Sequence, residues 1–474
     1  MVNSHTRWLF ISIMTILLST QAFAVSVQTN GRVEDPFSSE SLLAGKDFTI
    51  QLTEAERQLS EKFSVQLSVI GKGDPLYVWF GHTGLVVNDG RDNRKIMYDY
   101  GIFSFRSGFY KSFIMGRLLY EVWATNAEAR FRQTVEENRS ARLIDLQLDP
   151  SAKLELIRFL NFNTQTENQQ YLYHHYYANC STRIRDVIDK AVDGQFRTWA
   201  LGQPSPYTIR QDVMRHTAPY PFIDWALNFL QGGAIDKPVT LWERMFIPEV
   251  LEQAVLDFHY TNEQGKSVAL ASAVQSLHVQ SDSSVRPPVL STYRPSTIYW
   301  FVGSTAAGLI VLIMKILSTI TGSRGLRLLF RFLFGFFNWG WTLATGFAGS
   351  LLLFMMLFTT HDYSYWNENI IFVNPLLLVM SIQSLRIIAG KPKALKRFEN
   401  LNGFLALVTL IVMMAKVLLP EYLIQANWQI ILTMLPLYLS NAPLKFERNR
   451  KQKESSKRRD GATLREDSSD FNDL

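Results

Sequence analysis

The sequence predicts an α+β domain followed by a bundle of apolar helices that cross a membrane. Between residues 25 and about 295, charged, aromatic and aliphatic residues mix at short spacing, as in a globular domain. Two segments there, 77–90 and 96–105, are rich in β-branched and aromatic residues, which predicts strands. Apolar residues recur at helical spacing after Cys180, which predicts a helix. After Ser296 the composition changes to a series of apolar segments, which predicts a membrane domain.

The N-terminus has the three parts of a secretory signal peptide. Arg7 precedes a short apolar run, and an Ala-Phe-Ala pattern that ends at Ala24 gives a small-residue cleavage site. A retained anchor helix is the weaker interpretation, because the run is well below the roughly 20 residues that span a bilayer. The predicted organisation is a signal peptide at 1–24, an exported domain at 25–285, a linker at 286–296, a membrane domain of about five helices at 297–441 and a disordered charged cytoplasmic tail at 442–474.

The membrane domain is predicted from apolar segments at 297–317, 334–358, 370–385, 401–419 and 428–439. The first, second and fourth are long enough to span a bilayer. The third and fifth are shorter or contain Pro375 and Pro436, so their ends are less well defined.

The loops between these segments predict the orientation of the chain. Lys and Arg collect after the first, third and fifth segments, whereas the loops at 361–369 and 420–427 contain neither. Because cytoplasmic loops collect Lys and Arg, the N-terminal domain is predicted outside and the C-terminus inside. The 48 Lys and Arg against 42 Asp and Glu therefore indicate topology rather than a nucleic-acid partner.

Cys180 is the only cysteine of the chain, and export would place it in an oxidising compartment. A single thiol forms no internal disulfide, so it indicates either chemistry or a buried inert side chain. Asn179, Ser181 and Thr182 are residue types that cap helix starts, which puts Cys180 at a helix N-terminus. The N-H groups and dipole there favour the thiolate, so we predict a nucleophile.

A cysteine nucleophile needs a histidine base near it in space. His174 and His175 are closest to Cys180 in sequence, but their aromatic neighbours in 171–177 fit a packed helix face. His82 is the better candidate, because it lies in the first predicted strand, which holds a side chain in a fixed direction. The expected hairpin places Asp99 roughly opposite His82, where its carboxylate would orient the imidazole. A register slip of one residue would put Tyr98 or Tyr100 there instead.

Several stretches together resemble the Lnb N-terminal periplasmic domain family. They are F-G-H-T-G-L at 80–85, Y-D-Y-G-I-F-S-F at 98–105, G-R-L-L-Y at 116–120, Y-Y-A-N-C-S-T-R-I-R-D at 176–186, D-K-P-V-T-L-W-E-R-M-F-I-P at 236–248 and H-D-Y-S-Y-W-N-E-N-I-I-F-V-N-P-L at 361–376. The family is similar to a circularly permuted form of the papain and NlpC/P60 cysteine enzymes, in which the histidine strand precedes the cysteine helix. The fold implied is therefore a permuted papain-like or NlpC/P60-like periplasmic domain, followed by the α-helical transmembrane bundle.

The resemblance implies lipoprotein N-acyltransferase activity at the bacterial inner membrane. A fatty acyl chain would pass from a phospholipid to the cysteine as a thioester, and then to the α-amine of a diacylglyceryl-cysteine lipoprotein. Carried over by position, Cys180 is the nucleophile and His82 the base. The third member does not carry over in the same way, because permuted relatives fill it with different polar residues, so Asp99 rests on the expected hairpin. The candidates for substrate binding are Asn179, Ser181, Tyr98, His361, Asn367 and Asn369. The expected partners are the membrane, a phospholipid donor and a diacylated lipoprotein acceptor, with no nucleic acid, no metal and no cofactor.

Other interpretations stay open from the sequence. A cell-wall peptidase or amidase would use the same Cys-His pair, and a membrane-anchored scaffold would need Cys180 only for structure. His361, Asn367 and Asn369 fit a polar cap on two transmembrane helices equally well. A zinc site of His174, His175 and Cys180 lacks recognisable ligand spacing. Residues 203–280 are expected to be mostly helical, with Arg210 and Glu243 as further polar candidates.

Overall fold

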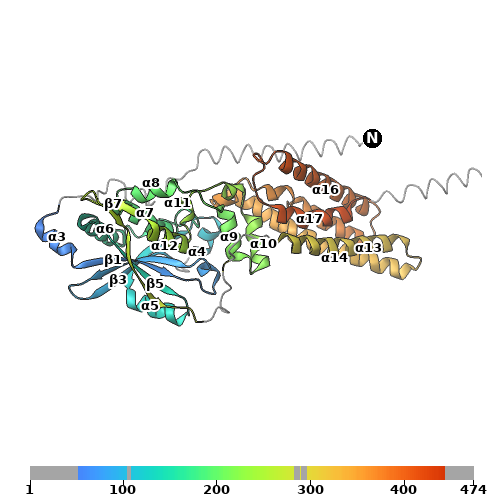
Figure 1. The fold of residues 1–474 in the computed structure, drawn as a ribbon. Helices are drawn as coiled ribbons and strands as arrows, with labels where there is room; N and C mark the ends of the chain where they lie inside the picture. The colour runs from blue at the N-terminus through green and yellow to red at the C-terminus, as the bar shows by residue number, and fades with distance from the viewer. Residues whose placement is uncertain (1–51, 104–107, 282–288, 290–295, 444–474) are drawn as a thin grey trace, which may run out of the picture. The chain divides into compact units, whose positions relative to one another are not determined.

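The computed structural model describes residues 52–103, 108–281, 289 and 296–443 (Figure 1). The predicted signal peptide and most of the predicted linker and tail lie outside these residues. The chain forms two compact units. The N-terminal unit comprises the chain up to Ser296 together with 352–368 and 424–426, and the second unit comprises 297–351, 369–423 and the chain from Asn427.

The N-terminal unit is built on a seven-stranded antiparallel sheet with the strand order β6-β4-β3-β2-β1-β5-β9. Its strands are β1 (Phe63–Ile70), β2 (His82–Asp89), β3 (Arg94–Ile102), β4 (Leu119–Asn126), β5 (Ala141–Leu146), β6 (Gln170–Leu172) and β9 (Ala271–His278). A small second sheet pairs β7 (His259–Thr261) with β8 (Ser267–Ala269). The α+β class predicted from the sequence is confirmed.

Helices cover both faces of the large sheet (Figure 1). One face carries α5 (Ala127–Glu136), and the other carries α6 (Pro150–Asn163), α7 (Cys180–Ala191) and α12 (Pro248–Asp257). The other helices of this unit are α3 (Glu54–Ser60), η1 (Leu76–Val78), α4 (Phe109–Ile114), α8 (Gln195–Leu201), α9 (Ile209–Thr217), α10 (Pro221–Leu230), η2 (Gly233–Asp236), α11 (Leu241–Arg244) and η3 (Asp362–Ser364).

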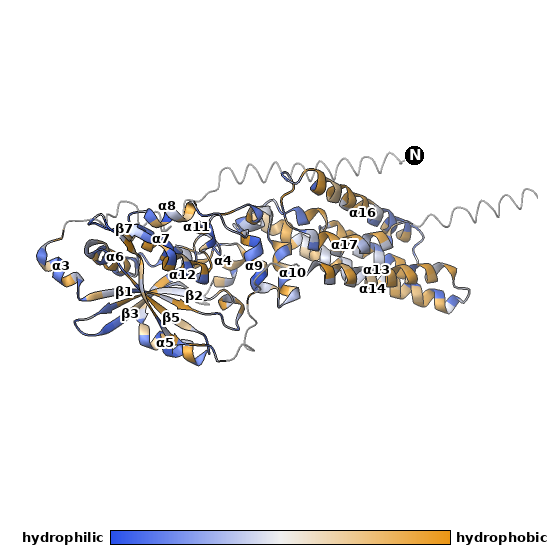
Figure 2. Cartoon of the chain, in the orientation of Figure 1, coloured by the Kyte–Doolittle hydropathy of each residue, from blue (hydrophilic) through white to orange (hydrophobic). Residues whose placement is uncertain are grey.

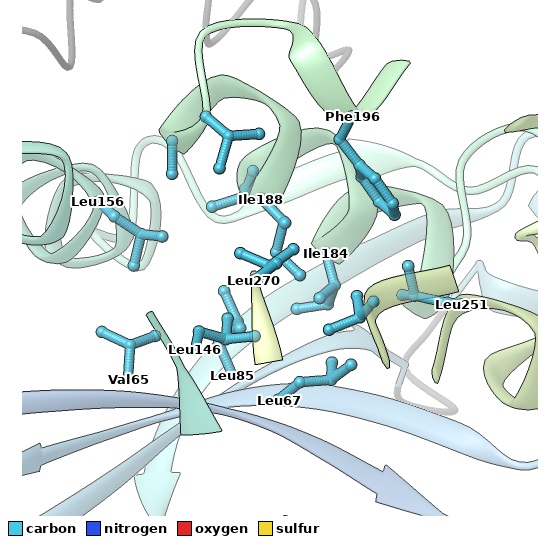
Figure 3. Packing of buried hydrophobic residues seen from close by; sticks show 14 of the residues in the cluster. Val65, Leu67, Leu85, Leu146, Leu156, Ile184, Ile188, Phe196, Leu251 and Leu270 are labelled. Atoms are coloured by element: carbon cyan, nitrogen blue, oxygen red, sulfur yellow. The ribbon is translucent and has the colours of Figure 1, made fainter. Parts of the chain in front are cut away.

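The main hydrophobic core lies between the sheet and the face of α7. Leu67 of β1 and Leu85 of β2 pack there with Ile184 and Ile188 of α7, and all four side chains are buried (Figure 3). Side chains alternate between the two faces of a strand, so Val86 of β2 packs on the opposite face, in the cluster that includes Ala127 of α5. The core thus fixes α7 against β2 and β3, which sets the position of Cys180.

The second unit consists of apolar helices, as the sequence predicted (Figure 2). They are α13 (Thr297–Ile320), α14 (Arg324–Phe358), η4 (Glu368–Ile371), α15 (Leu376–Ile388), α16 (Ala394–Leu418) and α17 (Trp428–Asn441). Among the described residues, four helical segments are long and apolar enough to cross a membrane: Thr297–Ile320, Arg324–Phe358, Glu368–Ile388 and Ala394–Leu418. The fifth predicted segment forms α17, which has 14 residues and contains Pro436.

Parts of the two loops without Lys or Arg, residues 361–368 and 424–426, belong to the same compact unit as the N-terminal domain. The Gly232 N-H donates to the Tyr363 carbonyl at 2.7 Å, and the Gln425 side chain donates to the Gln231 carbonyl at 3.0 Å. The side of the membrane on which these loops and the C-terminus lie stays a prediction from the distribution of Lys and Arg.

One expectation about local structure was wrong, and a second was right only in part. Residues 171–177 were expected to fit a packed helix face, but they form β6 and a turn closed by a bridge between His174 and Ala178. Residues 203–280 are helical only as far as Asp257, and the remainder forms three strands. Strand β9 pairs with β5, a partner more than 100 residues earlier in the chain, so no local pattern could predict it.

Candidate active site

Cys180 is the first residue of α7, as the sequence predicted. The Asn179 side chain accepts from the N-H groups of Ser181 and Thr182, both at 2.9 Å. In return, the Thr182 hydroxyl oxygen accepts from the Asn179 N-H at 2.8 Å, which completes a capping box. The cap fixes the start of the helix at the residue that carries the thiol.

The strands separate where the cysteine meets the sheet. The register of β2 with β3 extends only as far as Gly84 and Asp99, while β1 still pairs as far as His82. Beside this point β3 has a bulge between Tyr100 and Ile102, and Gly101 adopts φ +87°. A Cβ on Gly101 would lie 3.6 Å from the Cys180 Cβ. The bulge therefore lets α7 bring its first residue up to β2.

The His82 side chain hydrogen-bonds to both Asp99 and Cys180. Its Nε2 faces an Asp99 carboxylate oxygen, which leaves Nδ1 for the thiol. The other Asp99 oxygen accepts from Arg130 Nε of α5 at 3.1 Å. Asp99 is fully buried, and its two charged partners account for both of its oxygens. The four side chains form one continuous chain from α7 through the sheet to α5.

Electrostatics favour a charged pair at this site. Burial opposes protonation of His82, but the Asp99 carboxylate and the Cys180 thiolate outweigh it and raise the His82 pKa to about 10. Burial also raises the pKa of Cys180, yet the adjacent imidazolium and the Thr83 backbone N-H lower that pKa below the usual 9.0. Burial raises the pKa of Asp99, whereas His82 and Arg130 lower it more strongly. The shifts together favour the ionised forms of the three groups, a thiolate beside an imidazolium and a carboxylate.

The hairpin register differs from the expected one without moving Asp99 to the other face. Asp99 pairs with Gly84 rather than with His82, so the register of β3 against β2 differs by two residues from the expected one. Because side chains alternate with a period of two, a shift of this size keeps both side chains on one face. The Tyr98 and Tyr100 hydroxyls instead donate to Asn161 and Asn163 of α6, in the core on the opposite face.

A group of polar atoms converges beside the thiol. The open space beside Gly101 can be marked by the point where a Cβ on this residue would lie. This point is 3.9 Å from the Cys180 backbone N and 3.9 Å from the Tyr171 hydroxyl oxygen. The Tyr171 side chain is 2 % exposed, and its hydroxyl oxygen faces the Gly101 backbone N-H. Burial raises the Tyr171 pKa, so the hydroxyl keeps its proton and acts as a donor. Tyr171 and the Cys180 N-H are thus placed to bind an oxyanion.

Not every backbone N-H group at the start of α7 is available to an oxyanion. The N-H groups of Ser181 and Thr182 are occupied by the Asn179 cap, so they do not face the reaction centre. The Ser181 hydroxyl donates to the Met245 carbonyl at 2.7 Å, and the Asn179 side chain donates to the Phe246 carbonyl at 2.8 Å. Both side chains build the start of α7. Tyr98 belongs to the core, as described above.

The remaining predicted binding residues hold loops in place. His361 Nε2 donates to the Phe113 carbonyl at 3.0 Å, and the Asn367 side chain donates to the Phe229 carbonyl at 2.9 Å. In the second unit, the Asn427 side chain donates to the Asn369 side chain at 3.0 Å. All three predicted residues are buried, an arrangement typical of a polar cap. Binding of substrate by His361, Asn367 or Asn369 stays a prediction.

Other polar candidates have structural partners as well. Arg210 forms a buried ion pair with Asp236 at 2.7 Å, and Glu243 closes the capping box of α11 with Thr240. His174 hydrogen-bonds to Asp362 at 2.8 Å rather than joining Cys180. Over the part of the chain that the structure describes, no group of three or more His, Cys, Asp or Glu residues is placed to hold a metal ion.

Comparison with protein families agrees with this geometry. Residues 57–215, which include Cys180, His82 and Asp99, match the family model of the Lnb N-terminal periplasmic domain. This region is an Lnb N-terminal periplasmic domain. The chain is therefore a membrane protein in which the Lnb domain is periplasmic and apolar helices follow it. Neither the comparison with curated proteins nor that with solved structures gives a match.

Sequence reasoning missed two residues of the candidate site. Arg130 lies on α5, 31 positions after Asp99, and it reaches Asp99 only because α5 packs under β3. Tyr171 lies in the aromatic run before Cys180, but a helical interpretation of that run hid its position on β6 beside the thiol. In the sequence, only its place in this aromatic run pointed to Tyr171, and no feature pointed to Arg130.

Proposed function

We propose that the protein is a cysteine-dependent acyltransferase that moves a fatty acyl chain from a phospholipid to the free α-amine of a diacylated lipoprotein. The single observation that carries the proposal is the hydrogen-bonded chain of Cys180, His82 and Asp99 at the start of α7. The Lnb family of the domain and the attached apolar helices support a substrate at the membrane surface.

In the first step, the Cys180 thiolate attacks the carbonyl carbon of a phospholipid ester. The carbonyl oxygen becomes an oxyanion, which the Cys180 N-H and the Tyr171 hydroxyl are placed to bind. The ester C-O bond then breaks, and the His82 imidazolium gives its proton to the leaving oxygen. A lysophospholipid departs, and the acyl chain stays on Cys180 as a thioester.

In the second step, the neutral α-amine of the lipoprotein attacks the thioester carbonyl. His82, now neutral, accepts the proton that the amine nitrogen loses. The C-S bond breaks and restores the thiolate beside the imidazolium, while the product carries an amide. Asp99 and Arg130 do not touch the reacting atoms; they hold the imidazole with Nε2 turned away from the thiol.

The test is the intact mass of the full-length protein purified from membranes, before and after neutral hydroxylamine, together with the Cys180→Ala variant. We expect a fatty-acyl mass increment that hydroxylamine removes and that Cys180→Ala lacks. The protein should also transfer this acyl group to a synthetic diacylglyceryl-cysteine peptide with a free amine.

Two outcomes would overturn the proposal. Cys180 that stays unacylated in the presence of phospholipid would remove the thioester step, and cleavage of a cell-wall peptide by the same preparation would then favour the peptidase. Transfer of acyl groups by Cys180→Ala at the parental rate would show that the cysteine is structural.

A further inference from the structure

Helix α4 of the periplasmic unit exposes large apolar side chains. Tyr110 is 69 % exposed and Ile114 is 55 % exposed, and because they are four positions apart they lie on the same side of the helix. Phe113 beside them and Leu119 just after the helix are exposed as well. Exposure of such side chains to water is unfavourable, so a surface of this kind indicates a partner.

Hydrogen bonds fix α4 to the chain that leaves α14. The carbonyl of Met115, the C-cap residue of α4, accepts from the Thr360 N-H at 2.9 Å and from the Thr360 hydroxyl at 3.0 Å. One turn earlier, the Phe113 carbonyl accepts from His361 Nε2 at 3.0 Å. Residues 352–368, which include the last residues of α14, belong to the same compact unit as α4. These contacts therefore hold α4 beside the end of α14 within one unit.

The end of α14 marks the level at which the hydrocarbon of the bilayer ends. Helix α14 is long and apolar enough to cross a membrane, and its last residues, 351–358, are all apolar. Phe358 at its end is 63 % exposed, as expected of a side chain that faces lipid. Thr360 follows two positions later, which is at most about 7 Å of extended chain. Helix α4 is therefore anchored at the membrane interface.

The charged side chains of the same segment suit this level. Lys111 on α4 and Arg117 just after it are both exposed. At a membrane interface, long basic side chains reach the phosphate groups of lipids, while aromatic and aliphatic side chains enter the boundary between head groups and acyl chains. Residues 109–119 thus carry the three kinds of side chain that such a boundary binds.

We propose that residues 109–119 form a membrane seat, in which the exposed side of α4 enters the leaflet of the bilayer that faces the periplasmic domain. The partner is the phospholipid of that leaflet. The proposal goes beyond acyl transfer, because it holds whatever reaction Cys180 performs. Tyr120, the residue after the seat, pairs with Tyr171 of β6, so the seat would also hold this edge of the sheet at the bilayer surface.

The first test measures the depth of α4 by spin labelling. Cys180 is the only cysteine, so the full-length Cys180→Ala variant accepts a single new cysteine for a nitroxide. Tyr110→Cys and Ile114→Cys lie in the seat, whereas Val135→Cys of α5 and Val274→Cys of β9 are controls at apolar positions that are 46 % and 52 % exposed. In phosphatidylcholine vesicles, nitroxide collisions with oxygen, which concentrates in lipid, are compared with collisions with a water-soluble nickel chelate. We expect the oxygen-to-nickel ratio in the seat to exceed that of the controls by about threefold or more.

Two results of this experiment would overturn the proposal. Ratios at 110 and 114 that equal those at 135 and 274 would place α4 in water. Few collisions with either reagent would show that protein covers α4, from another segment of this chain or from a second copy. Neither result depends on a thioester at Cys180, so failure of the seat is distinguishable from failure of acyl transfer.

A second test places a charge in the seat. Ile114→Asp, added to the protein labelled at Tyr110→Cys, should lower the oxygen-to-nickel ratio at 110 by about threefold, because a carboxylate favours water over the lipid boundary. Val274→Asp is the matched control and should leave that ratio unchanged. With Cys180 retained, Ile114→Asp should be alkylated by iodoacetamide within twofold of the parental rate, which shows that the domain keeps its fold. A ratio at 110 that Ile114→Asp does not change would overturn the assignment of α4 to the bilayer.

Discussion

Two histidines of the periplasmic unit, His82 and His216, have opposite electrostatic environments. His216 of α9 is 3 % exposed, stacks on Phe80 at 4.7 Å and donates from Nδ1 to the Asp212 carbonyl at 2.7 Å. Burial lowers its pKa to about 4, so the ring is neutral at pH 7. His82 has the buried Asp99 carboxylate and the Cys180 thiol as partners, and its pKa rises to about 10.

The comparison shows that burial alone removes charge from a histidine, whereas a buried carboxylate restores it. In the sequence, neither histidine shows whether its ring is charged, because the Asp99 carboxylate that faces His82 lies 17 positions away. Reactivity therefore follows from the partners of the ring. Each prediction below tests this difference.

The largest effect is expected from replacing His82, with the same replacement of His216 as the control. His82→Asn removes the imidazolium that stabilises the thiolate, so the rate of alkylation of Cys180 by iodoacetamide at pH 7.5 should fall on the order of 10²-fold. Acyl transfer should fall by about 10²- to 10⁴-fold, the usual contribution of a general acid-base group. His216→Asn is the matched control, and its alkylation rate should stay within twofold of the parent. Equal losses in both variants would show that the distinction between the two rings is wrong.

Stability should depend on pH through His216. Its pKa in the folded state lies below the ordinary 6.5, so the unfolded chain binds more protons between about pH 6.5 and 4. Stability is therefore fully present above pH 6.5 and is lost as pH falls, by about 3 kcal/mol at pH 4 for this one group. The check is the thermal unfolding temperature of the full chain against pH, for the parent and for His216→Asn. A variant with the same acid slope as the parent would contradict the assignment.

Asp99→Asn should move the alkaline limit of activity. The raised His82 pKa keeps the imidazolium protonated until pH rises through about 10, while thiolate is lost as pH falls through the lowered Cys180 pKa. Without the Asp99 carboxylate, the alkaline limit should shift to lower pH and the maximal rate should fall about 10- to 10²-fold. The measurement is the pH profile of kcat/KM for acyl transfer.

The control for this change is Asp89→Asn at the far end of β2, where the carboxylate pairs with Arg91 at 2.7 Å. Its pH profile should coincide with that of the parent. A profile of Asp99→Asn with an unmoved alkaline limit would show that Asp99 does not govern the charge of His82.

A smaller effect is expected from the tyrosine beside the thiol. Tyr171→Phe removes one of the two donors placed for the oxyanion, so kcat should fall about 10- to 10²-fold with KM nearly unchanged. Tyr100→Phe removes a hydroxyl that donates to Asn163 in the core, so it should lower the unfolding temperature and leave kcat unchanged. A rise in KM without a loss of kcat in Tyr171→Phe would assign this hydroxyl to substrate binding instead.

The smallest effect concerns a histidine-carboxylate pair outside the catalytic chain. Asp362 hydrogen-bonds to His174 at 2.8 Å, but its side chain is 53 % exposed, so solvent screens the pair. Asp362→Asn should cost less than about 1 kcal/mol of stability and leave Cys180 alkylation unchanged. The readouts are the unfolding temperature and the alkylation rate at pH 7.5. A tenfold fall in alkylation would connect this pair to the thiol.

The sequence by itself determined the elements that carry the catalytic groups. The capping residues around Cys180 and the helical spacing after it were enough to predict α7, because a helix start depends on side chains within three residues. The alternation along 77–90 and 96–105 placed His82 and Asp99 on adjacent strands, and a register error of two residues left them on the same face. The apolar segments after Ser296 were long enough to identify the membrane helices by composition alone.

Tertiary structure alone decided which groups meet. Arg130 reaches Asp99 across the sheet, and Tyr171 reaches the thiol from an edge strand that local sequence had suggested was helical. No single stretch of sequence predicts the separation of β2 from β3 or the bulge at Gly101. Together these two features let Cys180 reach His82. These contacts join residues 17 to about 100 positions apart. Local propensity cannot specify them, because their free energy comes from packing α5 and α7 against opposite faces of one sheet.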